Sequence, residues 1–282
     1  MSGTDPIAYV NGTFVPLSQA KVGIEDRAVL FADSVYEVVL VARGQLIDLA
    51  GHMARLERSV TELRFPAIDL PSVSAVLERL VSENAIADGM VYVQISRGEA
   101  PRALMPVENL KPSVFAFARA QAMPRTIADT KPVAAMTIPD LRWGRCDIKT
   151  TALVAPTLAQ LEARSAGFDQ VLFVDEQNNV TEGSASNAWI VRDGVLVTRE
   201  PGPKVLAGVT RTRLIALARS LQLKVVERAF SADEALQADE VFLSSATALI
   251  VPIARVNSAQ LKAPGPITTR LFDAYRTFAF GP

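Results

Sequence analysis

The chain has 282 residues, of which 49% are hydrophobic and 21% are charged. This is ordinary globular composition, which argues against extensive disorder, and the length allows one or two domains with a large core. Lysine and arginine total 29 against 30 aspartates and glutamates, so no global positive field exists to attract nucleic acid or anionic lipid. We therefore expect neither nucleic acid nor a membrane as a main partner.

The compartment is predicted from the cysteine count and the start of the chain. Cys146 has no second cysteine with which to form an internal disulfide, which fits a reducing compartment. Residues 1–6 contain no basic segment followed by an apolar stretch, and no later run approaches the roughly 18 uncharged apolar residues of a membrane span. We expect a cytoplasmic protein.

The first 120 residues predict two hairpins and two helices. Asn11-Gly12 lies between apolar runs and tolerates the positive φ angles of a tight turn, which predicts a hairpin over residues 7–15. A strand at 35–42 that is rich in β-branched residues, with a turn at Arg43-Gly44, predicts a second hairpin whose return strand is 46–49. Apolar spacing predicts further elements. These are helices at 52–63 and 73–81 and strands at 90–96 and 113–118.

The segment 121–127 has no periodicity and contains a proline, so we place an interdomain linker there. Asp193-Gly194 supplies another hairpin turn, and Ser231 with Glu234 fits a capping box at the start of a short helix. The predicted class is α+β with two domains, a smaller one at 1–120 and a larger one at 128–282. The other elements expected in the second half are strands at 170–174, 188–191, 195–198, 224–227 and 240–244, and helices at 156–166, 210–221 and 267–278.

Several familiar sites are excluded first. The chain has no glycine-rich nucleotide-binding motif and only one histidine, which excludes a metal cluster built on histidines. That residue, His52, stands near the start of a helical pattern and is expected to be structural rather than the partner of a nucleophilic serine. We expect no metal site.

The segment 142–151 contains the residues best suited to catalysis. A lysine nucleophile needs a lowered pKa, and Lys149 follows Arg142 and Arg145 closely in sequence. Taken alone, the better interpretation of any such lysine is a solvent-exposed side chain beside a charge cluster. A second polar stretch at 180–187 contains Glu182, which by itself is equally compatible with a carboxylate in a turn.

As a set, these stretches resemble the class IV aminotransferases, which include branched-chain aminotransferases, D-amino acid transaminases and aminodeoxychorismate lyases. The resemblance covers nearly the whole chain, in matching order. The segments that carry it are 9–12, 26–27, 31–38, 52–56, 142–151, 180–187, 206–211 and 241–245. It implies the two-domain fold type IV, with 128–282 as the domain that binds pyridoxal 5′-phosphate (PLP), and a homodimer.

The resemblance also implies residue roles on PLP. Lys149 is the Schiff-base lysine, which then moves a proton at the substrate Cα. Glu182 pairs with the pyridine nitrogen so that the ring can accept charge. Arg55 is expected to bind the phosphate, although an exposed salt bridge on a helix is its alternative.

Three further residues are expected at the phosphate. Val209 and Thr210 open a helical pattern, so their backbone amides and the helix dipole can meet an anion, whereas the alternative is a simple helix cap. Ser245 would add a hydroxyl at the end of a strand, where serines are also common without ligands.

Within the family, residues 36–38, 97–102 and 145–149 look most like the D-amino acid transaminase branch. There a tyrosine and an arginine grip the substrate carboxylate, and Tyr36 and Arg102 take those places. Alone, Tyr36 could equally be an inward strand aromatic, and Arg102 a solvated loop charge. The branch has histidine two places after the arginine, where this chain has Leu104, so we expect a looser carboxylate grip that admits less polar amines.

The predicted function is therefore transfer of an amino group from a D-amino acid such as D-alanine to a 2-oxo acid such as 2-oxoglutarate. The alternative is an (R)-amine or branched-chain L-amino acid transaminase on the same fold. An aminodeoxychorismate lyase fits less well, given residues 36–38 and Arg102. A non-enzymatic PLP carrier remains the alternative from a different class.

Overall fold

The computed structural model describes residues 5–281, and its contacts divide the chain into two compact units. Unit 1 extends to Met123 and includes Ile148–Ala152, and unit 2 contains Pro124–Asp147 and Leu153–Pro282. Each unit combines a sheet with helices, as predicted for the α+β class. Within the described range, no helix combines the length and apolar character that a membrane span requires.

The two units differ from the expected blocks in one respect. The boundary after Met123 lies inside the segment 121–127, but Ile148–Ala152 groups with unit 1 and interrupts the block 128–282. The reason is backbone pairing that sequence periodicity does not reveal, because Val35 forms an antiparallel bridge with Thr150. The assignment of 128–282 as the cofactor-binding domain stays a prediction.

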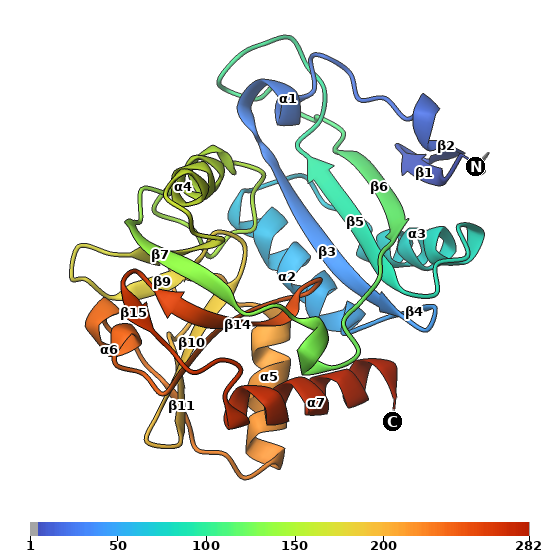
Figure 1. The fold of residues 1–282 in the computed structure, drawn as a ribbon. Helices are drawn as coiled ribbons and strands as arrows, with labels where there is room; N and C mark the ends of the chain where they lie inside the picture. The colour runs from blue at the N-terminus through green and yellow to red at the C-terminus, as the bar shows by residue number, and fades with distance from the viewer. Residues whose placement is uncertain (1–4, 282) are drawn as a thin grey trace. The chain divides into compact units, whose positions relative to one another are not determined.

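Unit 1 is built on a six-stranded sheet with the order β2-β1-β6-β5-β3-β4 (Figure 1). Neighbouring strands in this order pair antiparallel, and the long register of β3 with β5 runs from Ser34 opposite Ser96 to Val41 opposite Gly89. The predicted first hairpin is confirmed, with φ angles of 45° at Asn11 and 95° at Gly12. The strands are β1 (Ile7–Val10), β2 (Thr13–Pro16), β3 (Ser34–Ala42), β4 (Gln45–Leu46), β5 (Gly89–Ser96) and β6 (Ser113–Ala120).

Two amphipathic helices, α2 (Leu49–Glu62) and α3 (Leu70–Glu83), pack on this sheet. Leu56 and Val60 from α2, and Leu77 and Leu80 from α3, lie in one apolar cluster with buried strand residues. Removing this apolar area from water is the main stabilising contribution to the unit. The short helices η1 (Leu17–Gln19) and α1 (Arg27–Phe31) precede β3.

Unit 2 is built on a nine-stranded mixed sheet with the order β12-β11-β10-β13-β14-β7-β8-β9, with β15 on β14. Strands β7 and β8 are parallel, whereas β9 returns antiparallel to β8. This pairing brings the residue after β7 and the residues of β9 to the two sides of β8. The strands are β7 (Val133–Pro139), β8 (Gln170–Val174), β9 (Val180–Gly183), β10 (Asn187–Arg192), β11 (Val195–Thr198), β12 (Val225–Glu227), β13 (Glu240–Ser245), β14 (Leu249–Val256) and β15 (Ala259–Gln260).

The two faces of this sheet bury different clusters. Val171 and Phe173 pack with Ala159 and Ala163 of α4, whereas Leu172 between them joins the cluster that includes Ala235 of α6. This alternation follows from the two-residue period of a strand. The helices of unit 2 are η2 (Ile127–Asp129), α4 (Val154–Ser165), α5 (Val209–Ser220), α6 (Ala232–Leu236) and α7 (Pro266–Phe280), and α5 contacts α7 (Figure 1).

The prediction of a return strand at 46–49 is wrong beyond Leu46. Strand β4 has only two residues, Asp48 adopts φ 54°, and α2 begins at Leu49, so helix formation takes over the expected strand residues. We did not predict α1, β7, β9, β14 or β15. Strand β14 contains Pro252, which cannot donate to a ladder and therefore weakens the strand pattern in the sequence.

Candidate active site

Lys149 lies in the short segment that is bonded to the first half of β3. The amide of Tyr36 donates to the Lys149 carbonyl at 3.1 Å, and the amide of Thr151 donates to the Ser34 carbonyl at 3.1 Å. The lysine Nζ lies 4.2 Å from the centroid of the Tyr36 ring. Unit 1 therefore places the predicted nucleophile directly against one of the two residues expected to bind the substrate.

Tyr36 is part of an aromatic stack on β3 and β5. Its ring stacks on Tyr92 with centroids 5.5 Å apart, and the Tyr92 hydroxyl donates to Gln94 Oε1 at 2.7 Å. Burial, together with the neighbouring Tyr36, raises the pKa of the Tyr92 hydroxyl well above its ordinary value. Tyr92 therefore stays neutral and serves as a fixed apolar support for Tyr36.

Arg102, the other expected substrate residue, lies in the exposed loop between β5 and β6. Its guanidinium carbon lies 5.3 Å from the Phe31 ring centroid. The loop backbone is fixed by the buried Arg27, whose Nη1 and Nη2 donate to the carbonyls of Ala103 and Leu104 at 2.7 and 3.0 Å. Leu104 itself is 84% exposed. Within unit 1, Tyr36 and Arg102 thus have different surroundings, and their joint carboxylate role stays a prediction.

Arg55 belongs to a buried cluster with Glu37 and His52. Its Nε and Nη2 donate to the two Glu37 oxygens at 2.7 and 2.6 Å, and His52 Nδ1 lies 2.8 Å from Glu37 Oε2. Burial by itself raises the pKa of Glu37, but the charge and hydrogen bonds of Arg55, with those of His52, outweigh it and lower the pKa to about 2. The structure shows Arg55 fixed by Glu37, which we did not single out, and its phosphate role remains a prediction.

Arg55→Ala is expected to destabilise the fold strongly, because it leaves the fully buried Glu37 carboxylate without its forked partner. The free energy of unfolding at pH 7 should fall by about 3–5 kcal/mol. Since the folded pKa of Glu37 is about 2 against an ordinary 4.5, the loss should persist above about pH 4.5 and shrink as the pH falls toward 2.

Denaturant unfolding of wild type and variant across this pH range measures the effect. Arg219→Ala is the matched control, because Arg219 makes an exposed pair with Glu227 that is worth less than about 1 kcal/mol. Equal losses in the two variants would contradict a structural role for the buried cluster.

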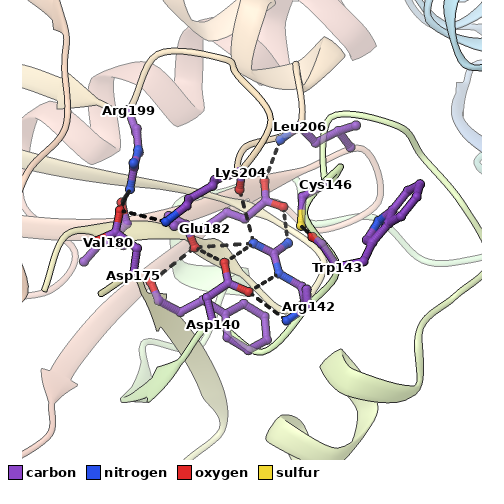
Figure 2. A network of polar contacts seen from close by, with 12 residues as sticks. Asp140, Arg142, Trp143, Cys146, Asp175, Val180, Glu182, Arg199, Lys204 and Leu206 are labelled. Atoms are coloured by element: carbon purple, nitrogen blue, oxygen red, sulfur yellow. Dashed lines mark hydrogen bonds and ion pairs between the residues drawn. The ribbon is translucent and has the colours of Figure 1, made fainter. Parts of the chain in front are cut away.

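In unit 2, Glu182 stands on β9 at the centre of a polar network (Figure 2). Its Oε1 accepts from Arg142 Nη1, and its Oε2 accepts from the Leu206 amide at 3.1 Å and from Asn187 Nδ2 at 3.3 Å. The expected pyridine-binding carboxylate is therefore buried and held by donors from three different segments. Glu182 lies on a strand, so the alternative from sequence, a carboxylate in a turn, is wrong.

Arg142 and Arg145 lie close to Lys149 in sequence, where their charges could lower the pKa of the lysine, but in the structure they pair with carboxylates. Arg142 bonds Asp140 and Glu182, and Arg145 Nε lies 2.9 Å from Asp147 Oδ1. Each guanidinium is thus paired with carboxylates, so its charge is largely balanced locally. Their presence in the sequence alone does not establish that they activate the lysine.

Asn187 connects Glu182 to the segment that leads into α5. Besides its contact with Glu182, its Nδ2 donates to the Leu206 carbonyl at 3.0 Å. Its Oδ1 lies so close to Gly208 that an added Cβ there would be 1.9 Å away. Gly208 is the N-cap of α5 with an ordinary φ of −64°, so its need for glycine is steric rather than conformational.

Val209 and the buried Thr210 form the first turn of α5, where backbone amides and the helix dipole favour an anion. Ser245 ends β13, and its Oγ accepts from the Ala248 amide at 3.3 Å. Unit 2 thus supplies a carboxylate and a helix N-terminus joined by Asn187. These donors fit a ligand with a basic ring nitrogen and a phosphate.

Gly208→Ala is expected to displace Asn187 and to weaken both stability and cofactor binding. Forcing a methyl group into this contact should lower the free energy of unfolding by about 1–3 kcal/mol. Gly202→Ala is the control in the same connection, because an added Cβ there meets nothing within 4 Å. Calorimetry and PLP titration of both variants test this, and indistinguishable results would contradict the close contact.

A family model and several relatives match most of the chain. The model of the family described as amino-transferase class IV matches residues 34–256. The chain belongs to the class IV aminotransferases. This aminotransferase is 36% identical over 271 residues to a D-alanine aminotransferase of Bacillus licheniformis, covering 94% of both chains. It is 30% identical over 274 residues to the D-alanine aminotransferase of Staphylococcus haemolyticus, covering 96% of both.

Solved structures agree on the fold of this aminotransferase. The branched-chain aminotransferase of Thermobaculum terrenum in its PLP form matches with a TM-score of 0.89 and 28% identity, over 99% of this chain and 95% of that one. The Thermoproteus uzoniensis branched-chain aminotransferase with norvaline matches with a TM-score of 0.88 and 26% identity, over 98% and 95%. The predicted family and fold type are confirmed.

Proposed function

We propose that this aminotransferase uses PLP to move the amino group of a D-amino acid such as D-alanine to a 2-oxo acid such as 2-oxoglutarate. The observation that carries the choice of donor is the similarity to D-alanine aminotransferases, which are 30% and 36% identical over 94–96% of this chain. The Lys149 Nζ lies against the Tyr36 ring, and the buried Glu182 carboxylate accepts from the Leu206 amide, which supports an enzyme rather than a carrier. PLP supplies an electron sink for the charge that develops when the substrate loses its α-proton.

Four residues have complementary roles in this proposal. Lys149 would hold the cofactor covalently, and its Nζ would remove and return the proton at the substrate Cα. Tyr36 and Arg102 hold the substrate carboxylate, with Arg102 offering a planar fork. Arg55, oriented by Glu37, binds the phosphate.

Other residues would hold the ring and the phosphate of the cofactor. Glu182 would hold a proton on the pyridine nitrogen. The amides of Val209 and Thr210 and the hydroxyl of Ser245 receive the phosphate, because helix N-termini bind anions without a further cation. A carboxylate that accepts from the ring nitrogen and a helix end that donates to the phosphate match the two ends of PLP.

We also infer a homodimer that works in the cytoplasm. Several large apolar side chains are exposed, among them Ile24, Val29, Leu104, Met105 and Val107 in unit 1 and Val154, Leu158 and Leu161 on α4 in unit 2. Exposed apolar groups of this kind are typical of surfaces covered by another subunit. The expectation of a reducing compartment rests on Cys146, which is free.

Steady-state assays of the PLP-loaded protein with 2-oxoglutarate test the donor. We expect D-alanine to give pyruvate and D-glutamate faster than L-leucine or (R)-1-phenylethylamine gives its product. Faster turnover of L-leucine would identify a branched-chain enzyme, and faster turnover of the amine an (R)-amine transaminase. Leu104 is the residue that favours the latter alternative.

Leu104→His is expected to improve the grip on the carboxylate, because it adds a polar donor two residues from Arg102. The KM for D-alanine should fall severalfold, since a hydrogen bond to a charged group is worth about 1.5–3 kcal/mol when formed fully, and kcat for (R)-1-phenylethylamine should fall. Val107→His, on the same exposed loop, is the control. An unchanged KM in Leu104→His would show that this position does not contact the substrate.

A further inference from the structure

The loop after β7 contains a guanidinium that links two carboxylates. Arg142 Nε and Nη2 donate to Asp140 Oδ1 and Oδ2 at 2.8 and 2.7 Å, and Nη1 donates to Glu182 Oε1 (Figure 2). The three side chains are only 8–9% exposed. A buried, forked arrangement of this kind fixes both the distance and the plane of the carboxylates.

The sheet explains how these residues meet. The Asp140 amide donates to the Val174 carbonyl at 2.8 Å, so Asp140 continues the β7–β8 pairing beyond the end of β7. On the other side of β8, β9 carries Thr181 and Glu182. The Thr181 hydroxyl donates to Asp140 Oδ2 at 2.7 Å. The anchor of the arginine is therefore itself built into the sheet.

The flat face of the Arg142 guanidinium packs over an aromatic ring. Its guanidinium carbon lies 4.7 Å from the centroid of the buried Phe173 ring, and Nη2 lies 3.3 Å from the Lys204 carbonyl. Burial would lower the pKa of Arg142, but Asp140 and Glu182 outweigh it and raise it. Burial raises the pKa of the neighbouring Cys146 thiol to about 11, so this group adds no charge at neutral pH.

We propose that Arg142, anchored by Asp140, is the positioning residue that holds the Glu182 carboxylate ionised and aimed at the pyridine nitrogen of PLP. This rests on the proposed role of Glu182. Arg142 occupies Oε1, and the Leu206 amide and Asn187 fix Oε2, so the carboxylate cannot rotate freely. Within the trio of Asp140, Arg142 and Glu182 two carboxylates face one guanidinium, and a protonated pyridine nitrogen brings the formal charge to zero.

Removing the guanidinium leaves Asp140 and Glu182 as two buried carboxylates. Like charges at short range raise the pKa of one member of such a pair, which then takes up a proton. A protonated or rotated Glu182 no longer holds a proton on the pyridine nitrogen. Arg142→Met should therefore change the state of the cofactor itself and not only the rate of turnover.

The test uses PLP labelled with ¹⁵N at the ring nitrogen, whose chemical shift reports protonation. In the wild-type holoenzyme at neutral pH we expect the protonated shift. In Arg142→Met we expect the chemical shift to move toward the unprotonated value. We also expect PLP affinity to fall roughly tenfold or more, because lowering the pKa of the ring nitrogen by one unit corresponds to a tenfold weaker interaction. Arg142→Lys keeps a charge but lacks the fork, and should also show the shift.

Arg199→Met is the matched control. Arg199 is also largely buried, with its Nη1 2.8 Å from Asp175 Oδ2 and 3.3 Å from the Val180 carbonyl at the start of β9. It therefore pairs with Asp175, whereas Arg142 pairs with Asp140 and Glu182. The ¹⁵N shift should stay as in the wild type. If Arg142→Met does not fold, Asp140→Asn carries the test, because it removes an anchor of Arg142 and should move the shift in the same direction.

The outcomes separate this inference from the proposed function. Loss of the protonated shift in Glu182→Gln, together with a wild-type shift and affinity in Arg142→Met, would overturn the role of Arg142 and leave that of Glu182 intact. A wild-type shift in Arg142→Lys would show that charge alone suffices and would overturn the positioning role. An unprotonated nitrogen in the wild type itself would overturn the role of Glu182 and the inference that rests on it.

Discussion

Replacing Lys149 with alanine is expected to abolish transamination, with kcat reduced at least ~10⁴-fold. The substitution removes both the covalent attachment and the amine that moves the proton at the substrate Cα, and general acid–base catalysis alone contributes about 10²–10⁴-fold. Stability should change little, because the Nζ contact with the Tyr36 ring is a single cation–π interaction worth about 1 kcal/mol. The measurement is pyruvate formation from D-alanine by the PLP-loaded variant.

Lys224→Ala is the matched control, because Lys224 is an exposed lysine. It should retain wild-type turnover and wild-type stability. Turnover of Lys149→Ala at more than a small fraction of the wild-type rate would contradict the assignment of the nucleophile. Activity recovered by added methylamine would instead support it, because a free amine can supply the missing base.

Glu182→Gln is expected to reduce kcat by roughly 10²–10³-fold, an effect comparable to removing a preorganised electrostatic partner of the reacting centre. Glutamine keeps the shape of the side chain, and its Oε1 can still accept from Arg142 or from the Leu206 amide. It loses the charge that holds the proton on the pyridine nitrogen. Single-turnover kinetics with D-alanine measures the loss in the chemical step.

Glu176→Gln serves as the comparison, because Glu176 pairs with Lys204 at an exposed position. Its turnover should equal that of the wild type. An equal rate in Glu182→Gln would mean that the pyridine nitrogen has another partner, and the structural support around Glu182 would then have no catalytic purpose.

Local features were predictable from sequence because neighbouring residues determine them. Asn11-Gly12 and Asp193-Gly194 adopt the positive φ angles that their turns require. The Ser231–Glu234 capping box is present, with the Glu234 amide 3.1 Å from Ser231 Oγ. In each case the decisive interaction spans four residues or fewer.

Features that depend on distant segments were missed. The five-residue segment Ile148–Ala152 joins unit 1 because of pairing with β3, more than 100 residues earlier. Strand β14 is stabilised by β13 and β7 on its two sides, which outweighs the proline that weakens its pattern. Neither arrangement leaves a local periodicity in the sequence.

The candidate site shows the same division. The resemblance to class IV aminotransferases singles out Lys149 and Glu182 as candidates, but it does not indicate which residues hold them. The partnership of Arg55 with Glu37, and that of Arg142 with Asp140, are tertiary contacts. In the sequence, Arg142 is only a charge near the lysine, whereas the fold makes it a partner of Glu182.

The most direct test of the central claim is an absorbance scan of the PLP-loaded protein mixed with D-alanine in the absence of any acceptor. We expect D-alanine to convert the lysine-bound cofactor completely to its amine form, and L-leucine and (R)-1-phenylethylamine to convert it more slowly. Conversion chiefly by L-leucine or the amine would contradict the proposed donor while leaving the chemistry of Lys149 in place. Failure of every donor to convert the cofactor would contradict an aminotransferase.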